Sequence, residues 1–120
     1  MKRDMDLVRQ ILMEIEKAST FTQEIELRIP PYSAEEIYYH VQLLDEAGLI
    51  ESVKFVDRAR IEIYPLRLTW EGHEFLDAAR DDTRWNKVKG AMAKAGGFVF
   101  EVAKALLIDY MKQQLIAPKP

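Results

Sequence analysis

The sequence contains no cysteine, and that absence excludes two kinds of site. Without thiols there is neither a disulfide framework nor a thiolate zinc centre, so a reducing compartment is the natural setting. Long hydrophobic runs are also lacking, because the richest apolar stretch, Phe98–Met111, has 14 residues and includes charged ones. Such a stretch is too short and too charged to cross a bilayer. The first residues, Met1–Asp6, enter a charged amphipathic pattern and not a signal-peptide pattern. We therefore expect a cytoplasmic protein with no membrane partner.

Residues suited to catalysis or metal binding are sparse. The two histidines, His40 and His73, fall on separate predicted helices without ligand-like spacing, and His40 neighbours an apolar stripe, as a structural residue would. Neither a phosphate-cradling glycine-rich loop nor a nucleophile elbow occurs. Helix capping explains the acidic pair Asp81–Asp82 more simply than metal binding does. We expect no enzyme activity, no cofactor and no small-molecule substrate.

What is present is the composition of a globular domain, with 48% hydrophobic and 31% charged residues in a chain of 120. The net charge of −3 is unevenly distributed. Residues 1–80 contain 10 basic and 16 acidic side chains, whereas residues 81–120 contain 7 basic and 4 acidic ones. This division predicts an acidic domain over residues 1–80 and a more basic helical extension over residues 81–120 that packs on it or mediates dimerisation.

Hydrophobic spacing predicts the order of the elements. Helical spacing covers Asp4–Ala18, and strict alternation over Thr22–Ile29 predicts a half-buried strand that ends at Pro30-Pro31. A helix follows over Ser33–Ala47, with a capping box at its start and Gly48 suited to a left-handed position after its end.

A pair of strands comes next, one around Val53 and Phe55 and one around Ile61 and Ile63, with a bulge or bend expected at Pro65. Three further helices complete the prediction: one capped by Thr69, one over Thr83–Ala95 ended by Gly96-Gly97, and one over Phe98–Leu115, before a frayed Ala117–Pro120.

Several blocks together resemble a family of small bacterial and phage-encoded winged-helix-like proteins of unknown function. These blocks are MKRDMDLVRQILMEIEK, YSAEEIYYHVQLLDEAGLIE, LTWEGHEFLDAARDDTRWNKVK and the glycine-led helix after them. The resemblance covers nearly the whole chain and implies a winged-helix-like fold in a bacterial or prophage setting. With winged-helix regulators in general, the chain shares only LLDEAGLI, the strand pair after it and the LT-x-x-G pattern.

Two features depart from a DNA-reading winged helix. A helix-turn-helix needs a helix packed just before the recognition helix, yet residues 19–32 have room only for a strand and two prolines. The Ser33–Ala47 helix also carries four acidic residues and no lysine or arginine, the wrong charge for a helix lying between phosphates.

Nucleic-acid binding therefore depends on two basic clusters. One cluster lies on the predicted hairpin, and the other is spaced to lie on one helical face. Tyr39 and Gln42 are candidates for contacts to DNA bases. The clusters are Lys54, Arg58, Arg60 and Arg67, and then Arg80, Arg84, Lys87 and Lys94. Each cluster is open to the alternative interpretation of an ordinary solvated face.

The last predicted helix raises a question of partners, because apolar residues surround it in place of forming one stripe. One interpretation is a homodimer whose interface centres on Phe98, Val102, Leu106 and Tyr110. The other is that the helix packs back across its own domain.

Together these patterns predict an α+β, winged-helix-like domain of order α-β-α-β-β-α with a two-helix C-terminal extension. The leading hypothesis is a non-catalytic binding protein that contacts double-stranded DNA in a regulatory role. The alternative is a protein–protein interaction module that has the winged-helix shape without DNA binding. The basic clusters favour the first, and the acidic helix favours the second.

Overall fold

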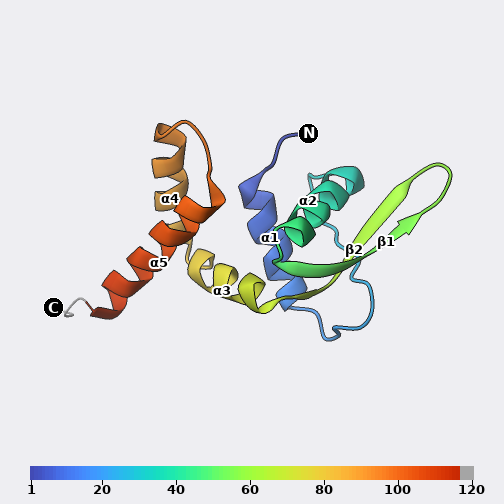
Figure 1. The fold of residues 1–120 in the computed structure, drawn as a ribbon, viewed down its shortest axis with the longest axis horizontal. Helices are drawn as coiled ribbons and strands as arrows, with labels where there is room; N and C mark the ends of the chain where they lie inside the picture. The colour runs from blue at the N-terminus through green and yellow to red at the C-terminus, as the bar shows by residue number, and fades with distance from the viewer. Residues whose placement is uncertain (117–120) are drawn as a thin grey trace. The chain divides into compact units, whose positions relative to one another are not determined.

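A computed structural model describes residues 1–116 and shows an α+β fold, which confirms the predicted class (Figure 1). A two-stranded antiparallel sheet follows two helices and precedes three others. The elements are α1 (Met5–Glu16), α2 (Ala34–Glu46), β1 (Ile50–Val56), β2 (Ile61–Leu68), α3 (Trp70–Ala79), α4 (Asp82–Lys94) and α5 (Phe100–Ile116). The predicted frayed segment Ala117–Pro120 lies outside the described residues.

The chain divides into two compact units, Met1–Glu74 and the part from Phe75 onward, so the division falls inside α3. The first unit holds α1, α2 and the β1–β2 hairpin, and the second holds α4 and α5. The boundary predicted after residue 80 lies just beyond the end of α3.

The core of the first unit comes from helical faces that the sequence spacing predicts. Leu7, Ile11 and Leu12 of α1 are fully buried, and Val41 and Leu44 of α2 are at most 2% exposed. Burying each such side chain contributes about 1.5–3 kcal/mol before ordering costs. Apolar burial at helical spacing therefore fixes how α1 and α2 face each other within this unit.

A buried histidine joins the start of α1 to α2. The Asp4 main-chain N–H donates to His40 Nε2 (2.8 Å), while His40 Nδ1 lies 2.8 Å from the Glu36 carbonyl. Because Nε2 accepts, the ring proton is assigned to Nδ1 and the imidazole is neutral. His40 is 2% exposed, which confirms its structural role. Asp4 Oδ2 also accepts the Tyr32 hydroxyl (2.7 Å), a bond that raises the pKa of Tyr32 to about 12.

The strand predicted over Thr22–Ile29 is wrong. In this segment Ile25, Leu27 and Ile29 are less exposed than their neighbours, but no strand forms there. Its one main-chain bond to the sheet runs from the Ile25 N–H to the Pro65 carbonyl (2.9 Å). Proline has no N–H to return the bond, and within residues 1–116 the next outward residue of β2, Ile63, makes no main-chain bond to this segment. The alternation correctly indicated which side chains turn inward and wrongly indicated pairing.

Both ends of α2 form as predicted. The Ser33 hydroxyl accepts the Glu36 N–H (3.1 Å), and the Glu36 carboxylate accepts the Ser33 N–H (3.0 Å), which makes a capping box. At the other end Gly48 has φ of +76°. The Gly48 and Leu49 N–H groups bond to the carbonyls of Asp45 (2.9 Å) and Leu44 (3.0 Å), which is a Schellman motif.

In the second unit Asp81 caps α4 by accepting the Arg84 N–H (2.8 Å), and Gly96 ends α4 with φ of +101°. The last helix begins at Phe100, two residues later than predicted, because the Gly96-Gly97 turn needs additional chain before helical geometry resumes. Its fully buried residues are Ala103 and Leu107. Trp85 is 1% exposed and meets the rings of Phe75 and Phe98 at centroid distances of 6.4 and 5.8 Å.

Candidate functional site

The base of the β1–β2 hairpin is closed by one threonine. The Thr69 hydroxyl donates to the Gly48 carbonyl (2.6 Å) and accepts the Gly72 N–H (3.0 Å), so it joins the end of α2 to the start of α3. The Thr69 N–H also donates to the Leu49 carbonyl (3.0 Å). The two ends of the hairpin are therefore held together, and the strands extend from a fixed base.

Along the strands, pairing is regular from Ser52–Pro65 to Val56–Ile61, with an irregularity next to Ser52. Glu51 pairs with Arg67 while Ser52 pairs with Pro65, which leaves Leu66 without a partner and makes a bulge. The bulge predicted near Pro65 is thus confirmed. It allows buried Pro65 and Leu68 to face the same side although they are three positions apart in the sequence.

A four-residue connection, Asp57–Arg60, closes the far end. The Asp57 carboxylate accepts the N–H groups of Ala59 (2.8 Å) and Arg60 (3.0 Å). These bonds hold the pKa of Asp57 below its usual value. Its charge is directed toward the turn backbone, which makes Asp57 a structural part of the tip.

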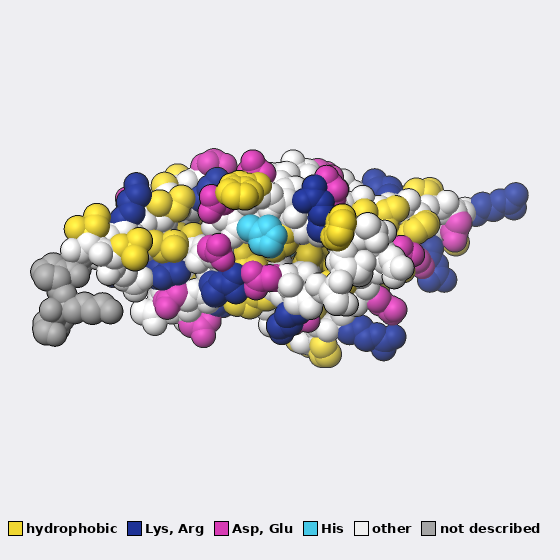
Figure 2. All heavy atoms as spheres, turned by 90° about the horizontal axis from the view of Figure 1, so that it is seen from below, with side chains coloured by type: hydrophobic (Ala, Val, Ile, Leu, Met, Phe, Trp, Pro, Cys, Tyr) yellow, Lys and Arg dark blue, Asp and Glu magenta, His cyan; other side chains and the backbone are white. Residues whose placement is uncertain are grey.

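The hairpin tip, defined as Lys54–Ile61, combines exposed cations with exposed apolar side chains. The Lys54 and Arg58 side chains are exposed and make no hydrogen bond or ion pair with residues 1–116. Within the same residues the Arg60 guanidinium has one ion pair, with Glu62 at 3.7 Å. Figure 2 shows blue and yellow side chains together at the right, where the hairpin of Figure 1 ends. The apolar members are Phe55 (47% exposed), Val56 (67%) and Ile61 (52%).

Sequence reasoning identified the tip's cations but missed its apolar residues as surface features. Phe55, Val56 and Ile61 fit a strand pattern, and that pattern does not reveal that the strands reach beyond the helices that would cover them. The available signal was apolar residues flanking both sides of a charged turn.

Arg67, the fourth predicted hairpin contact, is engaged within the chain. Its Nε and Nη2 bond to the two carboxylate oxygens of Glu51 (3.2 and 2.8 Å), and its Nη1 donates to the Leu68 carbonyl (3.0 Å). A guanidinium in a bidentate pair is already neutralised. Arg67 therefore braces the base of the hairpin.

The outer surface of α2 is polar and acidic. Tyr39 is 37% exposed, whereas Gln42 is half-buried and donates to Glu46 (3.3 Å). Tyr38 leans on the hairpin, with its ring 5.7 Å from that of Tyr64 and the two hydroxyls 3.4 Å apart. Of the two candidate base contacts, Tyr39 thus has the more accessible side chain.

The second predicted cluster is not a free stripe on one helix. Arg80 lies between α3 and α4, so its predicted place on one helical face with the others is wrong, and it pairs with Asp77 (2.8 Å). Arg84 donates to the carbonyls of Ala78 and Asp77 (both 3.2 Å) and to Gln114 (2.7 Å). It thus satisfies carbonyls at the end of α3.

Lys87 and Lys94 complete that cluster. The Lys87 ammonium lies 4.5 Å from the centre of the Tyr110 ring, a cation–π contact. Lys94 is exposed at the end of α4. Most of this cluster therefore stabilises the second unit, and the exposed cations of the hairpin tip are the better candidates for binding.

The four residues predicted at a dimer interface differ in surroundings. Phe98 precedes α5 and contacts the Trp85 ring, and the Tyr110 ring contacts the Lys87 ammonium. Leu106 is half-buried and Val102 is 49% exposed. Dimerisation through this helix stays a prediction, with Val102 offering the most surface.

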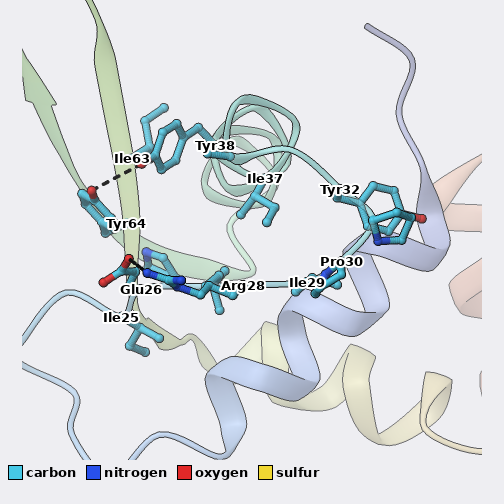
Figure 3. A pocket seen from close by; sticks show the side chains of 14 residues that line it. Ile25, Glu26, Arg28, Ile29, Pro30, Tyr32, Ile37, Tyr38, Ile63 and Tyr64 are labelled. Carbon is cyan, nitrogen blue, oxygen red and sulfur yellow. Dashed lines mark hydrogen bonds and ion pairs between the residues drawn. The ribbon is translucent and has the colours of Figure 1, made fainter.

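Grooves lie between α2 and β2. One, of about 410 Å³, lies among the segment 25–32, Ile37 and Tyr38 of α2, and Ile63–Pro65 (Figure 3). The other, of about 750 Å³, lies between the start of α2 and the hairpin tip. Tyr38 and Ala34 line both grooves. Hydrogen bonds with Tyr38 and Glu62 raise the pKa of Tyr64 and keep its hydroxyl neutral in the groove.

Within residues 1–116, no cluster of three or more histidine, aspartate or glutamate side chains is arranged to hold a metal ion. In the same part of the chain no helix is long and apolar enough to span a membrane.

The fold and these surfaces define a small α+β protein with a protruding, basic and apolar hairpin. The chain belongs to the family described as hypothetical protein (DUF2513), which matches residues 2–98. An uncharacterized protein of Haemophilus influenzae is 38% identical over 93 residues, covering 74% of this chain and 76% of that protein. No solved structure matches the chain. The family match ends before α5 begins.

Proposed function

We propose that this protein is a non-catalytic, winged-helix-like binding protein that contacts duplex DNA through its β1–β2 hairpin in a bacterial regulatory role. The observation that carries the proposal is the set of three exposed cations, Lys54, Arg58 and Arg60, on a hairpin held rigidly at its base. Exposed cations on a protruding element are what phosphate contacts require.

The order of elements supports the winged-helix comparison. Helix α2 leads through Gly48 into a hairpin, and the hairpin leads into α3, which is the order of a recognition helix followed by a wing. The first turn of α2 contains Glu35 and Glu36 and the helix has no lysine or arginine. Phosphates on either side of a groove would repel it, so the hairpin is the contact element.

The chemistry of the tip favours the minor groove. Proteins that bind there combine basic side chains with apolar residues that wedge against base steps. Phe55, Val56 and Ile61 supply exposed apolar surface beside Arg58 and Arg60. In this arrangement the cations bind the phosphates of the DNA backbone while the apolar tip enters the minor groove.

The test is a DNA titration at several salt concentrations with the full chain. Three phosphate contacts predict a slope of log affinity against log salt of about −3 per subunit. Replacing both Arg58 and Arg60 with alanine should weaken binding to all sequences alike and reduce the slope to about −1. Lys17→Ala is the matched control, because Lys17 is an exposed cation of the same unit outside the hairpin. Absence of salt-sensitive duplex binding at about 50 mM salt would overturn the proposal.

A second candidate is a protein partner for the same hairpin, and one observation favours it. Phe55, Val56 and Ile61 give the tip an apolar surface that a phosphate contact does not need. Such residues are typical anchors of protein interfaces. Loss of DNA binding from the double alanine variant would speak against this candidate, and failure of all DNA binding would favour it.

A further inference from the structure

Hydrogen-bonded and non-bonded residue pairs alternate along the hairpin, and the bond next to the turn shows which pairs are which. The Asp57 N–H donates to the Arg60 carbonyl (3.1 Å), so these residues form a bonded pair beside the turn. Bonded and non-bonded pairs alternate along an antiparallel ladder. The bonded pairs are therefore Phe55–Glu62 and Val53–Tyr64, and the non-bonded pairs are Val56–Ile61, Lys54–Ile63 and Ser52–Pro65.

Residues of non-bonded pairs direct their N–H and C=O groups away from the partner strand. Pro65 suits such a position because it has no N–H to donate. Ile61 and Ile63 consequently present their main-chain groups at the outer edge of β2. Within residues 1–116, the main-chain bond received along this edge is the one from Ile25 to the Pro65 carbonyl. Ile63 is 7% exposed and lines the groove. No main-chain bond from its outward amide to another segment is found within residues 1–116.

The edge lies along a trough made of the two grooves between α2 and β2. Ile63 and Pro65 line the groove beside the segment 25–32, and Ile61 lines the groove beside the hairpin tip. Tyr38 lines both, so the grooves are neighbours. Figure 3 shows Ile37, Tyr38 and Ile63 gathered at the first groove. From Ile61 to Pro65 the edge has five residues and a length of about 13 Å, and the bond from Ile25 occupies its Pro65 end.

We propose that the outer edge of β2 pairs with an extended peptide segment of a partner protein, which adds a strand along the trough. Strand addition uses main-chain bonds for affinity and pockets for alternate side chains for specificity. Here the bonds come from Ile61 and Ile63, and the walls that receive side chains are apolar and aromatic. Arg58 and Arg60 line the tip end together with Glu35 and Asp57. The Asp57 carboxylate is engaged by the turn N–H groups, so the cations outnumber the acids left to meet a ligand and favour an acidic residue of the peptide there.

An extended peptide fits better than a compact ligand, because the exposed main-chain groups repeat every second residue. The chain's own segment 26–29 does not supply the strand, because within residues 1–116 its main chain makes no bond to Ile61 or Ile63. Because the peptide site uses main-chain groups of β2 and the proposed DNA contact uses side chains of the tip, either proposal can fail alone.

The first measurement is amide hydrogen exchange by NMR on the full chain. The Ile61 and Ile63 amides should exchange much faster than those of Glu62 and Tyr64, which bond to β1. Protection of the Ile63 amide in the free protein at all concentrations would overturn the proposal. Protection that appears only as protein concentration rises would assign the edge to a second copy, which also overturns a peptide partner.

The second measurement uses a fluorescently labelled peptide EVTVTVE, which has an acid at each end and so serves either strand direction. Binding should protect the Ile63 amide. A peptide N-methylated at its valines and one N-methylated at its threonines should differ, because only one set of amides faces β2. Equal binding of the two N-methylated peptides, or no binding of the parent peptide at about 1 mM, a concentration suited to weak peptide affinities, would overturn strand addition.

A matched pair of variants completes the test. Ile61→Pro removes an outward N–H without removing a bond to β1, and Ile61→Thr retains that N–H with a similar β preference. Ile61→Pro should weaken the peptide about tenfold, the effect of one main-chain bond, and Ile61→Thr by about twofold or less. Circular dichroism checks that both variants fold. Equal affinity of two folded variants would contradict the inference.

Discussion

Gly72 marks the closest approach of two main chains in the first unit. A Cβ placed there would lie 2.0 Å from the Leu49 carbonyl oxygen and 3.0 Å from the Leu49 carbonyl carbon. Both atoms belong to the backbone, and the same oxygen accepts the Thr69 N–H (3.0 Å). In Gly72→Ala, α3 must therefore move away from the end of α2 by more than about 1 Å, since unstrained contacts need about 3.5 Å.

The cost can be worked out from these contacts. Overpacking of this kind costs about 1–3 kcal/mol, and weakening the Thr69 bond adds about 1 kcal/mol. The better helix propensity of alanine returns about 1 kcal/mol. The net loss of about 1–3 kcal/mol should lower the melting temperature by about 4–12 °C in a chain of this size.

Gly90→Ala is the matched control, because nothing lies within 4 Å of its added Cβ on exposed α4. That variant should melt at the wild-type temperature or a few degrees higher, since alanine is favoured over glycine by about 1 kcal/mol in a helix. Thermal unfolding followed by circular dichroism measures both. A Gly72→Ala protein that melts with the wild type would refute the close approach of α3 to the end of α2.

Three other predictions follow from the same contacts. Because Gly48 has φ of +76°, Gly48→Val should lower the melting temperature by several degrees while Gly48→Asn is tolerated, and equal melting of the two would mean that α2 ends differently. The bond to Asp4 raises the pKa of Tyr32 from 10.0 to about 12, so the stability that this bond contributes is present below pH 10 and is lost as the pH rises toward 12. In Tyr32→Phe the urea midpoint should fall less steeply between pH 10 and 12. An unchanged slope would count against the bond. We propose that the chain dimerises through α5, so light scattering should show Val102→Glu as a monomer and Leu115→Glu, on the opposite side of the helix, as a dimer; a wild-type monomer at high micromolar concentration rules this out.

Local chemistry explains what the sequence predicted well. The ends of α2 and the starts of α3 and α4 depend on residues within a few positions of one another, such as Ser33 with Glu36 and Thr69 with Gly72. Capping residues can be recognised from the sequence because the groups they bond to are neighbours in the chain. The bulge beside Pro65 was predictable for the same reason.

Errors arose where the outcome depends on distant partners. The segment around Ile25 alternates like a strand, but whether it pairs is decided by Pro65, forty residues later. Arg84 has the spacing of a binding residue, yet it serves the carbonyls at the end of α3. The exposed apolar tip around Val56 depends on how far the strands extend past α2, which the residue pattern does not state.

The hydrogen bonds of Thr69 to the end of α2 allow the tip of the hairpin to be replaced without a change at its base. Because its two ends are fixed to each other by the bonds to Gly48 and Leu49, the tip Lys54–Ile61 can lengthen, shorten or change sequence while Ile50, Ile63 and Leu68 keep their places in the core. Lengthening a closed loop is inexpensive, about 0.6 kcal/mol for each doubling. What the tip recognises can therefore change without a change in how the helices pack, and a foreign turn grafted between Val53 and Glu62 should be held by the same base.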